Sequence, residues 1–312
     1  MESAELNLQE IMRRFPDEKS ALDYFETIRW PSGMACPHCD SKRKFYIISG
    51  ARSGLKQCAD CKKQFRATVG TIFEGSHIPL HKWLVAWFLL CGAKKGMSAL
   101  QLKRRLWGDK KGSYKTAWFM AHRIRHAMQE ISNQKLAGTV EVDETYVGGK
   151  NIGKGWKRKM ENKTPVVSIV ERGGKKRSVV IKGHVTGKNL KQAIRDNVLI
   201  CSDVITDDYM GYRGIEPKYT HRQVKHMAKE FARKEKDLTV HTNTVESSFG
   251  LLKRGIIGSF HHISRKHLPL YLNEFDYRWN TRKQTDGERT LGALGRTHGK
   301  RLTMRQLVQN ED

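Results

Sequence analysis

Four cysteines stand in two closely spaced pairs, a pattern typical of a metal site. Cys36 and Cys39 belong to the segment CPHC, Cys58 and Cys61 belong to CADC, and eighteen residues separate the two pairs. Two residues between thiolates let one tight turn direct both sulfurs at the same ion, and two such turns complete a tetrahedron with no open position. The residues between the pairs predict a β-hairpin. We therefore expect a zinc ribbon over residues 31–72, in which the Zn2+ ion is structural.

Three carboxylates in the second half of the chain could form a second site. Asp143 lies in the extended segment TVEVDETYV, Asp207 lies near the end of DVITDD, and Glu246 lies in NTVESSFGLLKRG. Carboxylates brought together repel one another, and hard divalent cations such as Mg2+ relieve that repulsion by taking oxygen ligands. Two such ions ~3.5 to 4 Å apart would activate an attacking oxygen and stabilise a leaving one in phosphoryl transfer. Lys253 follows Glu246 by two helical turns, so it shares that face and could contact a phosphate.

Each carboxylate also has a structural explanation. A single Asp on a strand belongs more often to surface or turn chemistry than to catalysis. Asn243 precedes Glu246 by three residues, and the two would make a capping box that explains the glutamate without a metal. The pattern alone therefore leaves the metal site open.

An α/β sheet is expected to position these carboxylates. The pattern changes from helical to extended at Thr139, so a domain boundary is expected near residues 136–138. Beyond it, strands alternate with a helix, which indicates an α/β sheet that places its chemistry at strand ends. The expected strands are TVEVDETYV, PVVSIVER, SVVIKGHV and DVITDD, and the expected helix is KNLKQAIRDNVLI.

The segment 77–136 is expected to fold as a helical DNA-binding domain. Pro79 opens an apolar helix, Ser98 begins a second helix, and a third begins near Tyr114 after the turn GDKKG. The last two helices resemble a helix-turn-helix, although their turn is longer than the usual three to four residues. The alternative is a bundle with a solvated basic face. The residues expected to contact DNA are Lys103, Arg104, Arg105, Lys115, Arg123 and Arg125.

The charge of the chain favours a polyanionic partner. Among 312 residues, 58 are Lys or Arg and 32 are Asp or Glu, which gives a formal net charge of +26. A hydrophobic content of 38% argues against a wholly disordered basic tail. Ten basic residues and one acidic residue lie between Cys91 and Arg125, which favours phosphate contacts over a merely solvated face.

A second basic segment separates the first two expected strands. Residues 148–164 contain six basic residues and one acidic residue around Trp156. Glycine and charge predict a flexible loop there. It is either a solvated loop or an arm ordered by DNA, with the tryptophan stacked on a base or sugar. The residues of this loop expected to contact DNA are Lys154, Trp156, Lys157 and Arg158.

Several segments resemble the DDE-type transposases of insertion sequences that carry an N-terminal zinc ribbon, a subgroup found mainly in bacteria. The resemblance runs from about Arg29 to Asn280 and is most specific in VDETYVGG and HTNTVE. Further matching segments are RWPSGMACPHC, SALQLKRRL, YKTAWFMAHRIRHAM, ITDD, LLKRGIIGSFHHIS and YLNEFDYRWN.

The resemblance implies a ribonuclease-H-like catalytic domain over residues 138–285. Lys253 matches the basic residue that accompanies the catalytic triad in this subgroup. Glu144 and Asp208 stand next to triad positions, and only the alignment of the motifs excludes them from the triad. The triad, which would hold Mg2+ or Mn2+, consists of Asp143, Asp207 and Glu246.

The implied activity is that of a DNA transposase. Such an enzyme binds transposon ends on double-stranded DNA, cuts them with the help of a metal ion and joins the released 3′ hydroxyl to a target phosphodiester. A homodimer or larger assembly is expected, because two active sites must act on two ends. One alternative is a non-catalytic zinc-ribbon regulator derived from a transposase, which the three filled triad positions disfavour. The other is a ribonuclease-H-like nuclease or resolvase that cuts but does not join.

The expected organisation is multidomain and cytoplasmic, with association to the nucleoid. No secretory signal is visible, and the longest apolar run, residues 83–91, is far shorter than the ~18 to 20 residues of a membrane helix. The expected segments are an N-terminal helical segment (1–30), the zinc ribbon (31–72), the helical domain (77–136), the catalytic domain (138–285) and a C-terminal tail (286–312).

Overall fold

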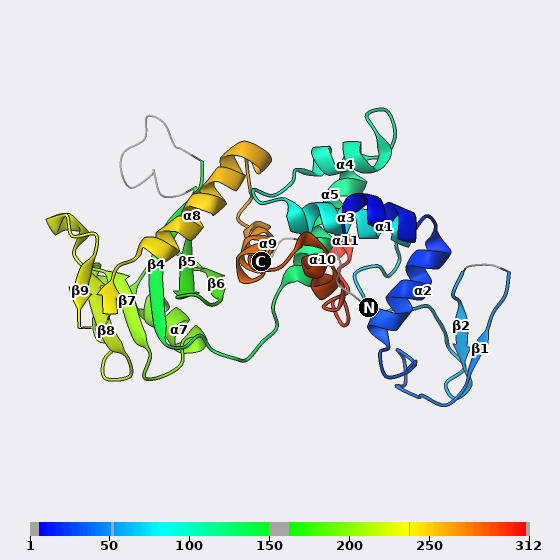
Figure 1. Cartoon of the computed structure of the whole chain (residues 1–312), viewed down its shortest axis with the longest axis horizontal. Coiled ribbons are helices and arrows are strands. Elements are labelled where there is room, and N and C mark those ends of the chain that lie inside the picture. The colour runs from blue at the N-terminus through cyan, green and yellow to red at the C-terminus, as the bar shows by residue number, and fades with distance from the viewer. Residues whose placement is uncertain (1–5, 51–52, 150–161, 237, 310–312) are drawn as a thin grey trace. The chain divides into compact units, whose positions relative to one another are not determined.

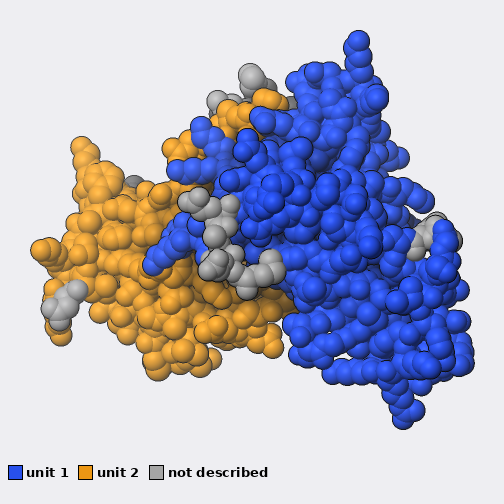
Figure 2. All heavy atoms as spheres, turned by 45° about the vertical axis from the view of Figure 1, so that its right-hand side comes forward, with its two compact units in different colours: residues 1–128, 282–312 blue, residues 129–281 orange. Residues whose placement is uncertain are grey.

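The structure is a computed structural model that describes residues 6–50, 53–149, 162–236 and 238–309. The chain divides into two compact units, which have different colours in Figure 2. Unit 1 comprises residues 1–128 and 282–312, and unit 2 comprises residues 129–281. No helix in the described ranges is long and apolar enough to cross a membrane.

Unit 1 begins with two helices and a small sheet. The sheet is antiparallel throughout, and its first two strands form the hairpin expected between the cysteine pairs (Figure 1). Phe65 of the third strand is buried against the two buried cysteines of the ribbon. These elements are α1 (Leu8–Arg14), α2 (Glu18–Arg29), β1 (Phe45–Ile47), β2 (Lys56–Cys58) and β3 (Gln64–Phe65).

The rest of unit 1 is helical. The helix expected to begin near Tyr114 is α5, which ends at Met128. Residues 286–312, expected to be a tail, contribute two helices, because Thr285 and Thr303 form capping boxes and the first of these helices packs on α3. The helices are α3 (Leu80–Gly92), α4 (Ala99–Trp107), α5 (Tyr114–Met128), α10 (Asp286–Leu294) and α11 (Met304–Val308).

Unit 2 is built on a mixed five-stranded sheet; the sequence predicted an α/β sheet but only four of its strands, and Thr220–Val224 is the additional one. The strand order is β6-β5-β4-β7-β8; β4, β5 and β6 pair antiparallel, whereas β4, β7 and β8 pair parallel. β4 and β7 run side by side from Thr139 and Asp203, so the end of the shorter β7 lies beside the middle of β4. The strands are β4 (Thr139–Gly148), β5 (Lys163–Glu171), β6 (Lys176–Val180), β7 (Asp203–Asp207) and β8 (Thr220–Val224).

Helices cover both faces of this sheet (Figure 1). Successive strand residues face opposite sides, so Val140 and Val142 pack with the apolar side of α7 (Gly187–Asn197). On the other face, α8 (Asn243–Gly255) and α9 (Leu268–Asn280) pack on residues of β4 and β5. The odd-numbered residues of β4, Asp143 among them, therefore face α8.

The described part of unit 2 also contains two 3-10 segments, two short strands and one π-helix. A hairpin of β9 and β10 precedes α8, and the π-helix directly follows the end of α8. These elements are η1 (Met210–Tyr212), η2 (His226–Ala228), β9 (Arg233–Glu235), β10 (Leu238–Val240) and η3 (Ile256–Phe260).

The edge strand β6 is closed by side chains of α9. Asp276 accepts hydrogen bonds from the backbone N–H of Ser178 at 2.6 Å and from its hydroxyl at 2.8 Å. Asn280 pairs with Lys176 as a strand would, since its amide accepts from the backbone N–H at 2.7 Å and donates to the carbonyl at 3.1 Å. The open edge is thereby blocked against pairing with another chain.

Candidate functional site

The ribbon brings its four cysteine sulfurs into one cluster. The Sγ atoms of Cys36 and Cys61 lie 3.7 Å apart, those of Cys39 and Cys58 lie 3.8 Å apart, and all four lie within 4.8 Å of one another. Four sulfurs at ~2.3 Å from a central Zn2+ in a tetrahedron would be about 3.8 Å apart. The spacing therefore fits a tetrahedral zinc site, as the sequence predicted.

The local backbone of the ribbon favours the thiolate that zinc requires. Hydrogen bonds from the backbone N–H groups of Cys61, chiefly, and Asp60 lower the pKa of the Cys58 thiol to about 7. Thiolates rather than thiols bind metals. At Cys39, against the backbone hydrogen bond from Ser41, burial and the side chains of the other three cysteines raise the thiol pKa to about 12. The feature that fits a structural zinc site is therefore the geometry of the four sulfurs.

In unit 2 the sheet register brings Asp143 and Asp207 together. Glu141 of β4 pairs with Ile205 of β7 in parallel. Continued by two residues, this register sets Asp143 level with Asp207, on strands ~4.8 Å apart. Both aspartates are only partly exposed.

The environment of Asp143 disfavours its charge. Burial first, then the neighbouring Glu144 carboxylate, and to a smaller extent Asp207 and Glu246, together raise the pKa of Asp143 to about 7. Burial, then Asp208, also raises the pKa of Asp207. Repulsion among these carboxylates means that the three predicted triad members share one electrostatic site.

Glu246 lies in the first turn of α8 and is held by two polar neighbours. The hydroxyl of Thr242 donates to Glu246 Oε1 at 2.7 Å. His226 Nε2 lies 3.1 Å from that hydroxyl and 3.5 Å from Glu246 Oε1. The capping box with Asn243 that would have explained the glutamate structurally does not form, because Asn243 lies inside the helix and Thr242 is the N-cap residue.

Glu144 is held on the opposite face of β4 from Asp143. The hydroxyl of Tyr212 in η1 donates a hydrogen bond to Glu144 Oε2. Burial raises the pKa of Glu144, an effect that this hydrogen bond partly offsets. The structure thus separates Glu144 from the α8 face, a distinction that the sequence motif made without a physical reason.

The carboxylates do not form a closed shell of ligands. In the part of the chain that the structure describes, the four cysteines are the only group of three or more His, Cys, Asp or Glu with ligand atoms all within 4.8 Å of one another. Glu246 has 47% of its side chain exposed. Lys253 is exposed on α8, two turns beyond Glu246.

The residues predicted to contact DNA fall into three sets. Lys103, Arg104, Arg105 and Lys115 are exposed or partly exposed on α4 and α5. Arg104 Nε lies 2.9 Å from Asp109 Oδ1, and Lys103 Nζ donates to the Asp109 carbonyl at 2.5 Å. The predicted residues that lie outside the described ranges are Lys154, Trp156, Lys157 and Arg158.

Arg123 and Arg125 form the third set, and their burial corrects the expectation that they face solvent. They are 5% and 1% exposed. The Arg123 guanidinium donates to the backbone carbonyl of Glu74 and stacks 4.9 Å from the ring centre of Phe119. An arginine can be buried when a carbonyl and an aromatic face replace its water. Both arginines therefore stabilise unit 1 from within.

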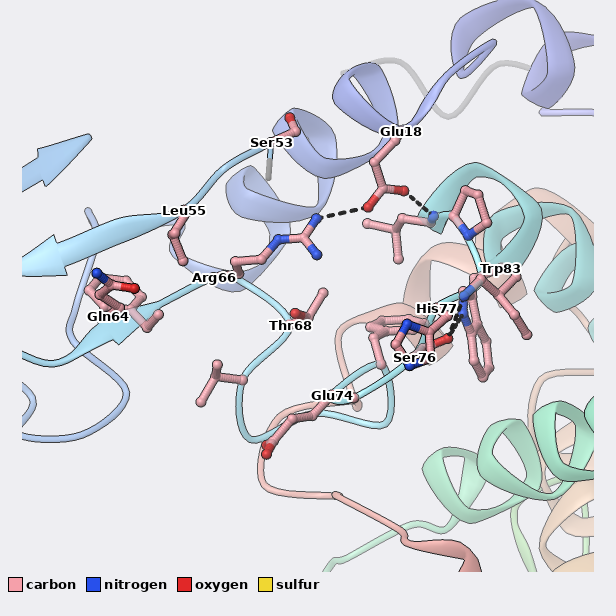
Figure 3. A pocket seen from close by; sticks show the side chains of 17 residues that line it. Glu18, Ser53, Leu55, Gln64, Arg66, Thr68, Glu74, Ser76, His77 and Trp83 are labelled. Atoms are coloured by element: carbon pink, nitrogen blue, oxygen red, sulfur yellow. Dashed lines mark hydrogen bonds and ion pairs between the residues drawn. The ribbon is translucent and has the colours of Figure 1, made fainter. Parts of the chain in front are cut away.

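A cavity of about 670 Å3 lies elsewhere in unit 1, between α2, the end of the ribbon and the start of α3 (Figure 3). Glu18 spans its upper side in the view, since its carboxylate accepts from Arg66 Nη2 at 2.8 Å and from the backbone N–H of Leu80. The Trp83 indole donates to Ser76 Oγ at 3.1 Å. None of the residues predicted to bind metal, to catalyse or to contact DNA lines this cavity.

Three residues around the carboxylates were not identified from the sequence. They are Thr242, His226 and Tyr212. Thr242 lies inside the HTNTVE segment, so its position beside Glu246 was available as a signal. His226 and Tyr212 stand in short 3-10 segments without recognisable spacing, and only the tertiary fold brings them to the site.

Comparisons with known proteins agree with this arrangement. Residues 16–64 match the transposase zinc-ribbon domain, and residues 135–280 match the ISXO2-like transposase domain. A protein of Halobacterium salinarum described as an uncharacterized protein in transposable element ISH50 is 26% identical over 285 residues, which cover 86% of this chain and 92% of that protein. These matches show that the chain combines a transposase zinc-ribbon domain with an ISXO2-like transposase domain.

Proposed function

We propose that this protein is a DNA transposase that cuts transposon ends and joins them to target DNA, with Asp143, Asp207 and Glu246 as ligands of Mg2+ or Mn2+. The observation that carries the proposal is that Asp143 and Asp207 lie side by side on adjacent strands, where burial and neighbouring carboxylates raise the pKa of Asp143 to about 7. A cluster of negative oxygens on an otherwise basic chain is the ligand set that hard divalent cations prefer.

We assign the catalytic unit to the ribonuclease-H-like class. The strand order β6-β5-β4-β7-β8, with three antiparallel and three parallel strands sharing β4, supports this assignment. So does the placement of one aspartate on β4, one at the end of β7 and a glutamate on the helix that packs over β4. The three side chains thus come from rigid elements rather than loops.

The chain's own residues would divide the work of phosphoryl transfer. Bound divalent ions would supply Lewis acidity and a deprotonated attacking water. Asp143 and Asp207 would hold these ions from the sheet, and Glu246 would hold them from α8, with its carboxylate oriented by Thr242. Lys253, exposed on the same helix, would contact the DNA backbone near the scissile phosphate.

Unit 1 is proposed to bind the double-stranded DNA of the transposon ends. Four basic side chains remain available on α4 and α5: Lys103, Arg104, Arg105 and Lys115. These two helices would act as a helix-turn-helix, and the net charge of +26 would supply the general attraction to phosphate. The same proposal includes DNA contacts by Lys154, Trp156, Lys157 and Arg158. It also includes a homodimer or larger assembly on DNA, because two ends must be processed together.

Asp143→Asn tests the catalytic assignment. With labelled DNA ends and Mg2+, the wild-type protein is expected to give nicked and joined products, and Asp143→Asn should give neither while binding the ends with unchanged affinity. Cleavage by the variant at the normal rate would overturn the triad. Wild-type cleavage without joining would assign the chain to the nucleases, and binding without cleavage would assign it to the regulators.

A further inference from the structure

A fully buried carboxylate joins β4 to the beginning of α8. Glu141 has no solvent exposure. Its Oε2 accepts hydrogen bonds from the backbone N–H groups of Thr244 at 2.8 Å and Val245 at 3.0 Å, and its Oε1 accepts from the hydroxyl of Thr244 at 2.8 Å. The strand side chain therefore ends directly on the first turn of the helix.

Glu141 performs the capping that α8 lacks from its own sequence. The first N–H groups of a helix have no partner within it and are usually satisfied by the N-cap side chain. In α8 the N-cap residue, Thr242, makes no such bond and directs its hydroxyl to Glu246 instead. A carboxylate is the best substitute, because its charge also interacts favourably with the positive end of the helix dipole.

Arg172 extends the connection to the chain that leads into α8. Its Nε donates to Glu141 Oε1 at 2.7 Å, and its other two nitrogens donate to the carbonyls of Thr239 at 2.5 Å and His241 at 3.0 Å. His241 Nδ1 lies 3.2 Å from Glu141 Oε1. The carboxylate, the guanidinium and the helix start thus form one hydrogen-bonded group that fixes α8 over the sheet.

The position of this group relates it to the proposed metal ligands. Asp143 lies two residues beyond Glu141 on the same face of β4, ~7 Å along the strand. Glu246 directly follows Val245, one of the backbone donors to Glu141. The same carboxylate therefore fixes the element that carries one metal ligand with respect to the element that carries another.

We propose that Glu141 is a positioning residue that sets the separation of the Asp143 and Glu246 carboxylates, and so the affinity and competence of the divalent-metal site. The proposal rests on the proposed function. An apolar residue would fill the same volume, but it would leave the N–H groups of α8 and the Arg172 guanidinium without their partner. A displacement of ~1 Å at a reacting centre can reduce a rate by about a hundredfold.

The first test compares Glu141→Gln with Glu274→Gln in the zinc-loaded full-length protein. The amide of a glutamine has one acceptor oxygen, so it would turn two N–H donors toward groups that are themselves donors. Glu274 is the matched control, because it is also fully buried and paired with an arginine, Arg278, but lies in α9. Three quantities are measured. Electron paramagnetic resonance gives the Mn2+ concentration for half-maximal binding. The other two are the cleavage rate at saturating DNA and metal and the dissociation constant for end DNA.

Glu141→Gln is expected to raise the half-saturating Mn2+ concentration about tenfold and to lower the saturated cleavage rate about 10- to 100-fold, with end-DNA affinity within about twofold of wild type. Glu274→Gln should alter thermal stability only. If Glu141→Gln fails to fold, Thr244→Val, which removes one hydroxyl donor, is expected to change both metal readouts in the same direction by about threefold. The proposal would be overturned if the folded Glu141→Gln variant, or Thr244→Val in its place, had the same Mn2+ affinity and cleavage rate as Glu274→Gln.

The failure of the proposed function gives a different result. If the wild type binds Mn2+ at this site but does not cleave DNA, the Mn2+ affinities of the Glu141 and Glu274 variants still decide whether Glu141 positions the ligands. If Asp143→Asn binds Mn2+ as tightly as the wild type, the ligand assignment itself is wrong, and the role of Glu141 is overturned with it.

Discussion

The hydroxyl of Thr242 donates a hydrogen bond of 2.7 Å to Glu246 Oε1, so the N-cap residue of α8 orients a proposed metal ligand instead of capping its helix. Because this hydroxyl donates its one hydrogen to the carboxylate, its oxygen accepts a hydrogen bond from His226 Nε2, 3.1 Å away. Asp207 lies close enough to His226 for the histidine to lower the aspartate's pKa, an effect smaller than the burial that raises it. The chain from histidine to threonine to glutamate thus connects two of the proposed ligands.

Thr242→Val should disturb the orientation of Glu246 with little change in packing. Thr242 is 1% exposed, and valine has nearly its shape but no hydroxyl. Net contributions of hydrogen bonds to charged groups are about 1.5 to 3 kcal/mol, but water can replace the hydroxyl at the half-exposed glutamate. We therefore expect a fall of about 3- to 10-fold in the single-turnover cleavage rate.

The matched variant for this experiment is Thr242→Ser, which keeps the hydroxyl and should cleave near the wild-type rate. The cleavage rate is measured over a range of Mg2+ concentrations, because a mispositioned ligand should also raise the Mg2+ concentration needed for the half-maximal rate. Equal rates for the valine and serine variants would show that the hydrogen bond has no part in the site.

Asp143 should make the stability of the divalent-free protein fall as the pH rises. Burial, then the Glu144 carboxylate, raises the pKa of Asp143 from 3.8 to about 7. Between these two values the native state binds more protons than the unfolded chain, so stability is lost as the pH rises through that window. Asp143→Asn removes the titration and is expected to stabilise the protein above pH 7 by a few kcal/mol at most, with little effect near pH 4.

Urea unfolding of the zinc-loaded protein at pH 5 and pH 8, without other divalent ions, measures this effect. The stabilisation by Asp143→Asn should be larger at pH 8, and added Mn2+ should stabilise the wild type more than the variant. If the free energy of unfolding depended on pH identically in the two proteins, the pKa of Asp143 would not be raised in the folded state.

Cys58→Ser should remove the zinc and unfold the ribbon while leaving unit 2 folded. The four sulfurs close a tetrahedral set, and serine is a poor replacement for a thiolate at such a site. Zinc content should fall from one ion per chain to near zero, as measured by atomic absorption. Cys201→Ser is the control, since Cys201 is exposed and lies outside the cluster. Retention of zinc by the Cys58 variant would contradict a four-cysteine site.

The sequence was most informative where short spacing or strict alternation determines structure. The two C-x2-C pairs predicted the sulfur cluster, and TVEVDETYV was predicted as a strand, on which the structure places Val140 and Val142 on one face and Asp143 on the other. The register of β4 against β7 was not predictable, because it joins residues about sixty positions apart and depends on the packing of the whole sheet.

Burial of charge was the main feature that the sequence could not reveal. Arg123 and Arg125 were expected on a DNA surface because arginine is usually exposed, but their partners, the carbonyls of Glu74 and Met97, come from other parts of unit 1. Glu141 likewise looked like one of three similar acids in VEVDE. Only the tertiary fold distinguishes a carboxylate that caps a helix from one that faces its neighbours at the strand ends.

The contrast between exposed and buried arginines gives a test of the DNA surface. Removing one side chain that neutralises a phosphate should reduce the slope of log K against log salt concentration by ~0.9. Arg105 is exposed on α4, so Arg105→Ala is expected to weaken end binding and to lower this slope by about one. Arg123→Met should instead lower thermal stability, because it leaves the Glu74 carbonyl without its donor, while the salt slope stays unchanged. Fluorescence anisotropy with end DNA at salt concentrations from about 50 to 300 mM measures both slopes. A lower slope for Arg123→Met, or an unchanged slope for Arg105→Ala, would show that DNA binds a different face of these helices.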